Sequence, residues 1–118
     1  VFKGSFVTYM DECKEILLDG KEILKTQGAI SEEMAYKMAS VVKFKLDTNI
    51  AVSFTGNAGP LPSENKEVGL VYSCIIIDDL ILNYKDIYSG NRMEIRQKCV
   101  KDAINRILEN LFLCSQIR

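Results

Sequence analysis

Tyr9 and Lys14 have side chains and a spacing that suit proton transfer. Between them stands Asp11, a residue type that often caps the N-terminus of a helix. A helix that starts there would place Lys14 in its first turn, where the helix dipole and burial both lower the pKa of an ammonium group. Such a lysine can act as a general base, with the phenol relaying the proton. Spacing alone favours a simpler interpretation, a solvated lysine and a core tyrosine whose hydroxyl is hydrogen-bonded.

The composition narrows the possible chemistry, because the chain contains no histidine. Histidine is the usual general base near neutral pH and the commonest metal ligand. Any base must therefore be a lysine, a tyrosine, a carboxylate or a thiolate, and we expect neither a metal nor a cofactor. The cysteines are scattered without a C-x-x-C pair, so we expect reduced thiols in a cytoplasmic protein. They are Cys13, Cys74, Cys99 and Cys114.

A glycine-rich segment, "TGNAGP", follows a predicted strand. Glycines in that position let the backbone approach a ligand closely and point its amides at an anion. The segment lacks the Gly-Lys-Ser/Thr of a Walker A loop. The pattern alone favours a simple turn at the end of a strand over a cradle for a phosphate or an oxyanion. The candidate binding residues are Thr55, Gly56, Asn57, Ala58 and Gly59.

Arg92 follows Ser89, Gly90 and Asn91 and opens the last predicted helix. An arginine after such a turn is more often solvated. Its planar guanidinium is also the preferred clamp for a carboxylate or a phosphate, so Arg92 is a further candidate for substrate binding.

The hydrophobic pattern predicts a single domain of alternating helices and strands. We expect strands over 5–9, 49–55, 68–77 and 80–88. We expect helices from 11 to a stop at Gly20, over 21–26, over 31–46 with Ser31 as the cap, and from about 91 to 111. The run over 68–77 is almost wholly apolar, which requires cover on both faces of the sheet. The predicted fold is therefore an α/β three-layer α/β/α sandwich with a mixed sheet.

Charge and hydropathy exclude two classes of partner. The formal net charge is −1, with lysines and glutamates interleaved, so no basic surface for a nucleic acid is expected. No apolar run approaches the roughly 18 residues of a membrane span, so we expect no membrane partner.

Five segments occur in one order: "GSFVTYMDECK", "GAISEEMA", "TGNAGP", "VGLVY" and "SGNRMEIR". Together they closely resemble the C-terminal domain of the competence/damage-inducible protein CinA, the nicotinamide-nucleotide amidase family. The resemblance runs from Phe2 to about Leu111. It implies a three-layer α/β/α domain and a homo-oligomer. It also implies deamidation of nicotinamide mononucleotide, with water, to nicotinate mononucleotide and ammonia in pyridine-nucleotide salvage.

The resemblance also implies roles for residues. In such enzymes a serine attacks the carboxamide, assisted by a tyrosine and a lysine that Tyr9 and Lys14 match. The glycine-rich turn, 55–60 here, would help to hold the nucleotide. A Gly-Asp-Arg segment of the family would correspond to Gly90, Asn91 and Arg92, with asparagine in place of aspartate.

Other departures bear on activity. Ser5 stands where the family usually has glycine, and Leu61 and Pro62 stand where more glycine is usual. The family's serine belongs to a Glu-Ser-x-Thr-Gly-Gly segment ahead of the strand over 5–9, and these 118 residues contain no such segment. We expect a partial sequence that lacks its first strand and helix. The alternatives are an inactive homologue, a non-catalytic nucleotide-binding module and an interaction domain with no small ligand. Ser5 is a remote alternative nucleophile.

Overall fold

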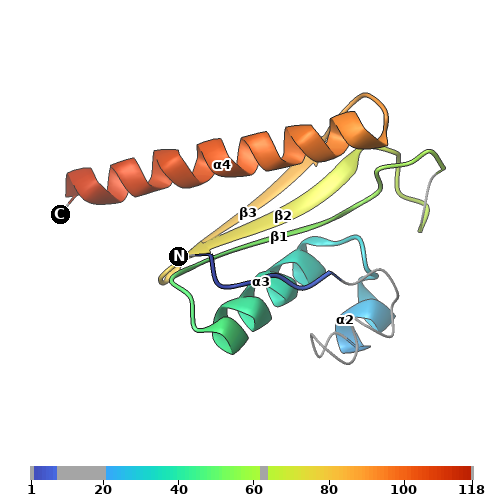
Figure 1. The fold of residues 1–118 in the computed structure, drawn as a ribbon. Coiled ribbons are helices and arrows are strands. Elements are labelled where there is room, and N and C mark those ends of the chain that lie inside the picture. Colours follow the sequence, from blue (N-terminus) through green and yellow to red (C-terminus); the bar gives the residue numbers. More distant parts are fainter. Residues whose placement is uncertain (1, 8–20, 62–63, 118) are drawn as a thin grey trace.

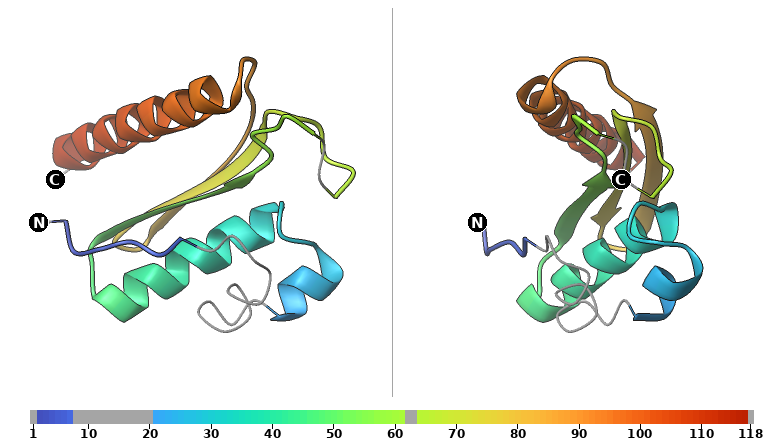
Figure 2. Two further views of the ribbon diagram at one scale, coloured as in Figure 1. Left: turned by 45° about the vertical axis from the view of Figure 1, so that its right-hand side comes forward. Right: turned by 90° about the vertical axis from the view of Figure 1, so that its right-hand side faces the viewer.

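The computed structural model describes residues 2–7, 21–61 and 64–117. Three strands, β1 (Ile50–Gly56), β2 (Leu70–Ile77) and β3 (Leu80–Ile87), form one sheet in the order β1-β2-β3. Helix α3 (Glu32–Leu46) covers one face of this sheet, and helix α4 (Arg92–Ile117) lies over the other (Figures 1 and 2). The short helix α2 (Lys21–Thr26) precedes α3. The predicted three-layer α/β/α arrangement is confirmed.

The central strand β2 explains the apolar run in the sequence. Seven of its eight residues are buried, and only Tyr72 is partly exposed. Successive side chains of a strand point to opposite faces of the sheet. Cys74 and Ile76 therefore pack under α3, whereas Val71 packs on the α4 side with Ile95. A strand covered in this way must be apolar on both faces, as the sequence predicted.

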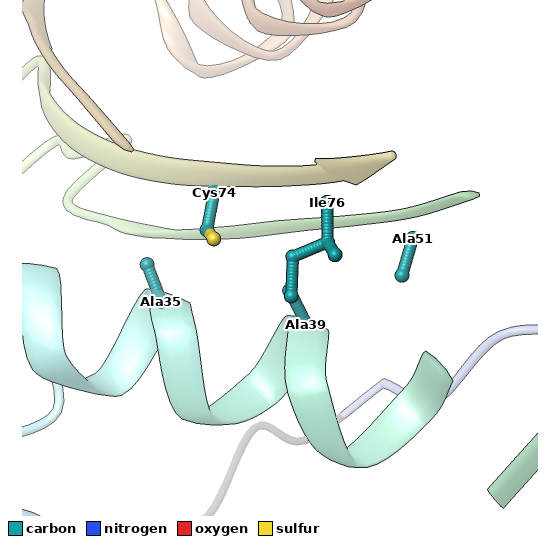
Figure 3. Packing of buried hydrophobic residues seen from close by; sticks show 5 residues of the cluster. All are labelled: Ala35, Ala39, Ala51, Cys74 and Ile76. Carbon is teal, nitrogen blue, oxygen red and sulfur yellow. The ribbon is translucent and has the colours of Figure 1, made fainter. Parts of the chain in front are cut away.

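Small side chains form the core between α3 and the sheet. Figure 3 shows Ala35 and Ala39 of α3 directed at the strands, where they meet Ala51 of β1 and Cys74 and Ile76 of β2. Alanines at this interface let the helix backbone approach the sheet closely, so little space remains for a larger side chain.

Helix α3 begins at the cap that the sequence predicted. The Ser31 hydroxyl accepts a hydrogen bond from the Met34 amide at 3.1 Å. Glu32 and Glu33 stand in the first turn, where the helix dipole favours acidic side chains. The helix ends at Asp47, whose φ of 49° lies in the left-handed region that often closes helices.

Two details of the predicted sheet differ from the structure. All three described strands pair antiparallel, so the part of the chain that the structure describes shows no mixed sheet. Of the predicted strand over 5–9, residues 5–7 form no strand and residues 8–9 lie outside the described residues. The predicted helix from 11 to Gly20 also lies outside the described residues. The segment before residue 5 is held at the end of α3, where the Lys3 ammonium donates to the Asp47 carbonyl at 2.6 Å. The last helix also extends to Ile117, beyond the predicted end near 111.

Candidate functional site

The glycine-rich turn follows directly from the end of β1, and both of its glycines are required by the backbone. A Cβ atom on Gly56 would lie 2.6 Å from the carbonyl oxygen of Leu70 in β2. Gly59 has a φ of 85°, in the left-handed region that side-chain-bearing residues rarely adopt. The turn therefore has one defined shape, fixed by its contact with the neighbouring strand.

Asn57 holds this turn together from within. It is buried, and its side-chain amide donates to the Lys66 carbonyl at 3.2 Å while its side-chain oxygen accepts from the Gly59 amide at 3.0 Å. Its own backbone amide donates to the Leu70 carbonyl at 2.9 Å. The amides of Asn57 and Gly59 are thus already hydrogen-bonded within the protein. Among residues 57–59, Ala58, which is half-buried, is the one whose amide has no partner among the described hydrogen bonds.

Thr55 joins the end of β1 to the turn between α2 and α3. It is buried, and its hydroxyl donates to the Ala29 carbonyl at 2.5 Å. The Glu64 carboxylate reaches the same turn and accepts from the amides of Ala29 and Ile30. Sequence reasoning missed Glu64, because a glutamate in a polar loop carries no signal of a partner 34 residues away.

Arg92 lies at the edge of the glycine-rich turn. It is the first residue of α4, and its guanidinium Nη1 donates to the Gly59 carbonyl at 3.3 Å. The positive charge therefore stands beside a helix N-terminus, where unpaired amides also attract anions. The structure thus brings together the turn and the arginine that the sequence picked out separately, although 33 residues lie between Gly59 and Arg92.

Asn91 and Glu94 fix the start of α4. The Asn91 amide donates to Glu94 Oε1 at 3.0 Å, and the Glu94 amide donates to Asn91 Oδ1 at 2.9 Å. This reciprocal pair is a capping box. Asparagine caps helices about as well as aspartate, so Asn91 is sufficient to fix the start of the helix at Arg92.

Tyr9 and Lys14 lie outside the described residues, so the structure does not place them relative to Arg92 or the turn. Their roles stay predictions. Among the residues that the structure describes, no group of three or more His, Cys, Asp or Glu side chains could hold a metal ion.

A second polar cluster joins α4 to β3, farther along the helix. The Tyr88 hydroxyl donates to Asp102 at 2.7 Å, and the Arg106 guanidinium makes two bonds of 2.8 Å with the Asp86 carboxylate. Burial and the bond to Asp102 raise the pKa of Tyr88 above its ordinary value, so the phenol stays neutral. The side chains of this polar cluster hold α4 against the sheet. None of them is joined to the glycine-rich turn by a hydrogen bond that the structure describes.

A hollow lies at the other end of the sheet. It has a volume of about 430 Å³ and lies between the C-terminal half of α3 and the turn at Asp78 and Asp79. Tyr36 and Phe44 form part of its wall. The glycine-rich turn follows the opposite end of β1, so this hollow is not part of the candidate site.

Comparison with known proteins identifies the family. The family described as the CinA C-terminal domain matches residues 1–111. The chain belongs to the CinA C-terminal domain family. A CinA-like protein of Petrotoga mobilis is 42% identical over 111 residues, which are 92% of this chain and 28% of that protein. The chain therefore spans about a quarter of the length of the curated relatives that it matches.

Solved structures of CinA proteins share the fold. The competence/damage inducible protein CihA of Agrobacterium tumefaciens is 35% identical, with a TM-score of 0.81 over 88% of this chain and 66% of that chain. The competence damage-inducible protein A of Klebsiella pneumoniae is 26% identical, with a TM-score of 0.85 over 89% of this chain and 66% of that chain. No helix in the described ranges is long and apolar enough to cross a membrane.

Proposed function

We propose that this CinA-family domain belongs to an amidase that converts nicotinamide mononucleotide and water to nicotinate mononucleotide and ammonia. The observation that carries the proposal is the contact of Arg92 with the glycine-rich turn at Gly59. It puts a fixed cation and the first amides of α4 beside a turn that a ligand can approach, which suits the phosphate of a mononucleotide.

The proposed chemistry uses a serine that the family resemblance assigns to a segment ahead of Val1. Its hydroxyl oxygen attacks the carboxamide carbon, and Lys14 accepts the proton directly or through Tyr9. The proton then passes to the amide nitrogen, which leaves as ammonia, and water hydrolyses the acyl-enzyme to release the carboxylate product. A lysine base suits a chain without histidine.

Substrate binding is assigned to the turn and to Arg92. Because the amides of Asn57 and Gly59 are bonded to Leu70 and to the Asn57 side chain, we propose that Ala58 offers an amide to the ligand and that Arg92 supplies the charge. Thr55, Gly56, Asn57 and Gly59 then act by shaping the turn. We further propose that the protein is cytoplasmic and forms a homo-oligomer. Light scattering of the complete protein would test the oligomeric state.

Ammonia release from nicotinamide mononucleotide by the complete protein tests the proposal. Replacing a general base typically costs about 10²- to 10⁴-fold in rate, so Lys14→Ala should lose that much, whereas Lys25→Ala, at an exposed lysine of α2, should not. Arg92→Ala should raise KM, with Arg96→Ala one turn later as the matched control. Equal rates for the parent protein and Lys14→Ala would contradict the assignment.

The rival proposal is a nucleotide-binding module without catalysis. The internal hydrogen bonds of the turn favour it, because they leave few groups that could stabilise a reacting centre. Calorimetry that shows mononucleotide binding, together with no deamidated product after long incubation, would support this rival.

A further inference from the structure

The loop between β1 and β2 is fastened to a distant part of the chain by one side chain. Glu64 Oε2 accepts a hydrogen bond from the Ala29 amide at 3.0 Å, and Glu64 Oε1 accepts one from the Ile30 amide at 2.9 Å. Both carboxylate oxygens are thus engaged by neighbouring backbone amides, 34 and 35 residues away in the sequence. Hydrogen bonds to an ionised carboxylate are stronger than bonds between neutral groups.

The local backbone suits a carboxylate at this point. The two amides stand directly before Ser31, the cap of α3, at the positive end of the helix dipole. Gly28 makes room for Glu64, because a Cβ atom there would lie 3.0 Å from Glu64 Oε1 and its φ is 85°. The turn before α3 is therefore shaped to accept this side chain.

The loop pays a conformational cost for the contact. Glu64 and Asn65 have φ values of 53° and 58°, both in the left-handed region. Asparagine tolerates that region, but a longer side chain such as glutamate rarely adopts it. The two amide bonds to Glu64 offset this strain, and without them we expect the loop to relax to other conformations.

The same contacts lead from Glu64 to the candidate site. Ala29, whose amide binds Glu64, also accepts the Thr55 hydroxyl at the end of β1. The loop residue Lys66 accepts the side-chain amide of Asn57, which in turn holds the amide of Gly59. Thr55 at the start of the turn is thus bonded to a residue that holds Glu64, and Asn57 inside the turn is bonded to a residue that lies two positions after Glu64.

We infer that Glu64 is a positioning residue for the substrate-binding turn: its carboxylate clamps the β1–β2 loop to the start of α3 and so fixes the turn against Arg92. This inference rests on the proposed function. Glu64 touches no reacting atom in this role. Its loss should therefore weaken substrate binding much more than it slows the chemical step.

Glu64→Gln in the complete protein tests this role, with Glu67→Gln as the matched control. A glutamine oxygen can accept from one amide, but its NH₂ group opposes the other, so the clamp is broken with little change in shape. Glu67 is exposed in the same loop, and the described hydrogen bonds include none to its side chain. We expect KM for nicotinamide mononucleotide to rise about tenfold in Glu64→Gln, the size typical of losing a charge-assisted hydrogen bond, with kcat nearly unchanged. Glu67→Gln should match the parent protein in both.

Hydrogen exchange supplies a second measurement that needs no substrate. The amides of Ala29 and Ile30 should exchange faster in Glu64→Gln than in Glu67→Gln. An active parent protein with equal KM in the two variants would overturn the positioning role, as would equal exchange at these amides. A parent protein that neither binds nor deamidates the mononucleotide would instead overturn the proposed function, and the positioning role with it. Faster exchange would then mark Glu64 as a purely structural clamp.

Discussion

The two faces of the sheet are covered in different ways. On the α3 face, the buried cluster has five members, none of them charged, and the buried Ser53 hydroxyl donates to the Ala35 carbonyl of the helix. On the α4 face, the buried cluster is Val71, Ile95 and Cys99, near the start of the helix. Farther along α4 the contacts become polar, with Tyr88 bound to Asp102 and Arg106 bound to Asp86.

This difference shows that α4 is anchored at the end that carries the candidate site. The capping box and the buried Ile95 lie within one turn of Arg92, so the backbone that carries the arginine is held in place. In the next turns an apolar stripe of the helix stays open, with Val100 and Ile104 each 52% exposed and Leu108 59% exposed. The α3 face supplies tight packing, whereas the α4 face supplies a firmly held helix start.

The largest expected effect comes from removing the anchor of α4. Ile95 is 1% exposed, and Ile95→Ala should lower the free energy of unfolding by about 2–5 kcal/mol, because it leaves a cavity in the core. Ile104→Ala removes the same atoms from the same helix at a half-exposed position and should cost less than about 1 kcal/mol. Urea unfolding of both variants measures the difference. Equal losses would mean that α4 is held along its length rather than at its start.

The α3 face should respond to alkaline pH through Cys74. Burial in the core, helped by the charge of Glu32, raises the pKa of this thiol to about 11 from its ordinary 9.0. Below pH 9 both folded and unfolded chains hold the proton, so the full stability is present. As the pH rises from 9 to 11 the unfolded chain ionises first, and about 2–3 kcal/mol of stability is lost.

Cys74→Ala isolates this contribution. Its unfolding free energy should be lower near neutral pH but should fall less steeply between pH 9 and 11 than that of the parent protein. Burial also raises the pKa values of Cys99 and Tyr88, and these two groups leave an alkaline loss of stability that is common to both proteins. Identical slopes in urea titrations across this range would show that the α3 core does not keep the thiol protonated.

Local patterns in the sequence predicted most of the fold. The cap at Ser31, the apolar run of β2 and the turn at Asp78 and Asp79 each depend on neighbours in the chain, and the structure confirms all three. The antiparallel pairing of the strands over 68–77 and 80–88 was predicted from their two-residue turn, and it is confirmed. The first described strand also pairs antiparallel, so the described strands form an antiparallel sheet where a mixed one was predicted.

Long-range polar contacts could not be predicted in the same way. Two such contacts join polar residues that are far apart in the chain: Glu64 with the amides of Ala29 and Ile30, and Arg106 with Asp86. From the sequence alone, each of these charged side chains could have had many other partners. In the candidate site, the residues could be picked out from the sequence, but their contact could not. Residue patterns and then the family resemblance pointed to the turn and to Arg92, and only the fold showed the contact between them at Gly59.

Overpacking compares the two faces directly. Ala39 on the α3 face and Ala103 on the α4 face are both buried, at 0% and 6% exposure. Ala39→Leu should lower the free energy of unfolding by about 1–3 kcal/mol, because the close helix–sheet contact cannot admit a longer side chain. Ala103→Leu should cost less, since α4 can move away from the sheet beyond its anchor. Thermal unfolding decides between them, and a greater loss for Ala103→Leu would reverse the comparison.

The smallest expected effect concerns the ion pair that replaces apolar packing on the α4 face. Arg106 and Asp86 are 21% and 23% exposed in their side chains, and the guanidinium also lies 4.0 Å from the ring centre of Tyr84. Water still screens a pair of this kind, so a double-mutant cycle with Arg106→Gln and Asp86→Asn should give a coupling of about 1 kcal/mol. Arg106→Lys should recover only part of it, because an ammonium lacks the planar fork that binds both carboxylate oxygens. The coupling should shrink as salt is added. A coupling near zero at low salt would mean that the outer part of α4 contributes nothing to holding the helix, and that its start alone positions Arg92.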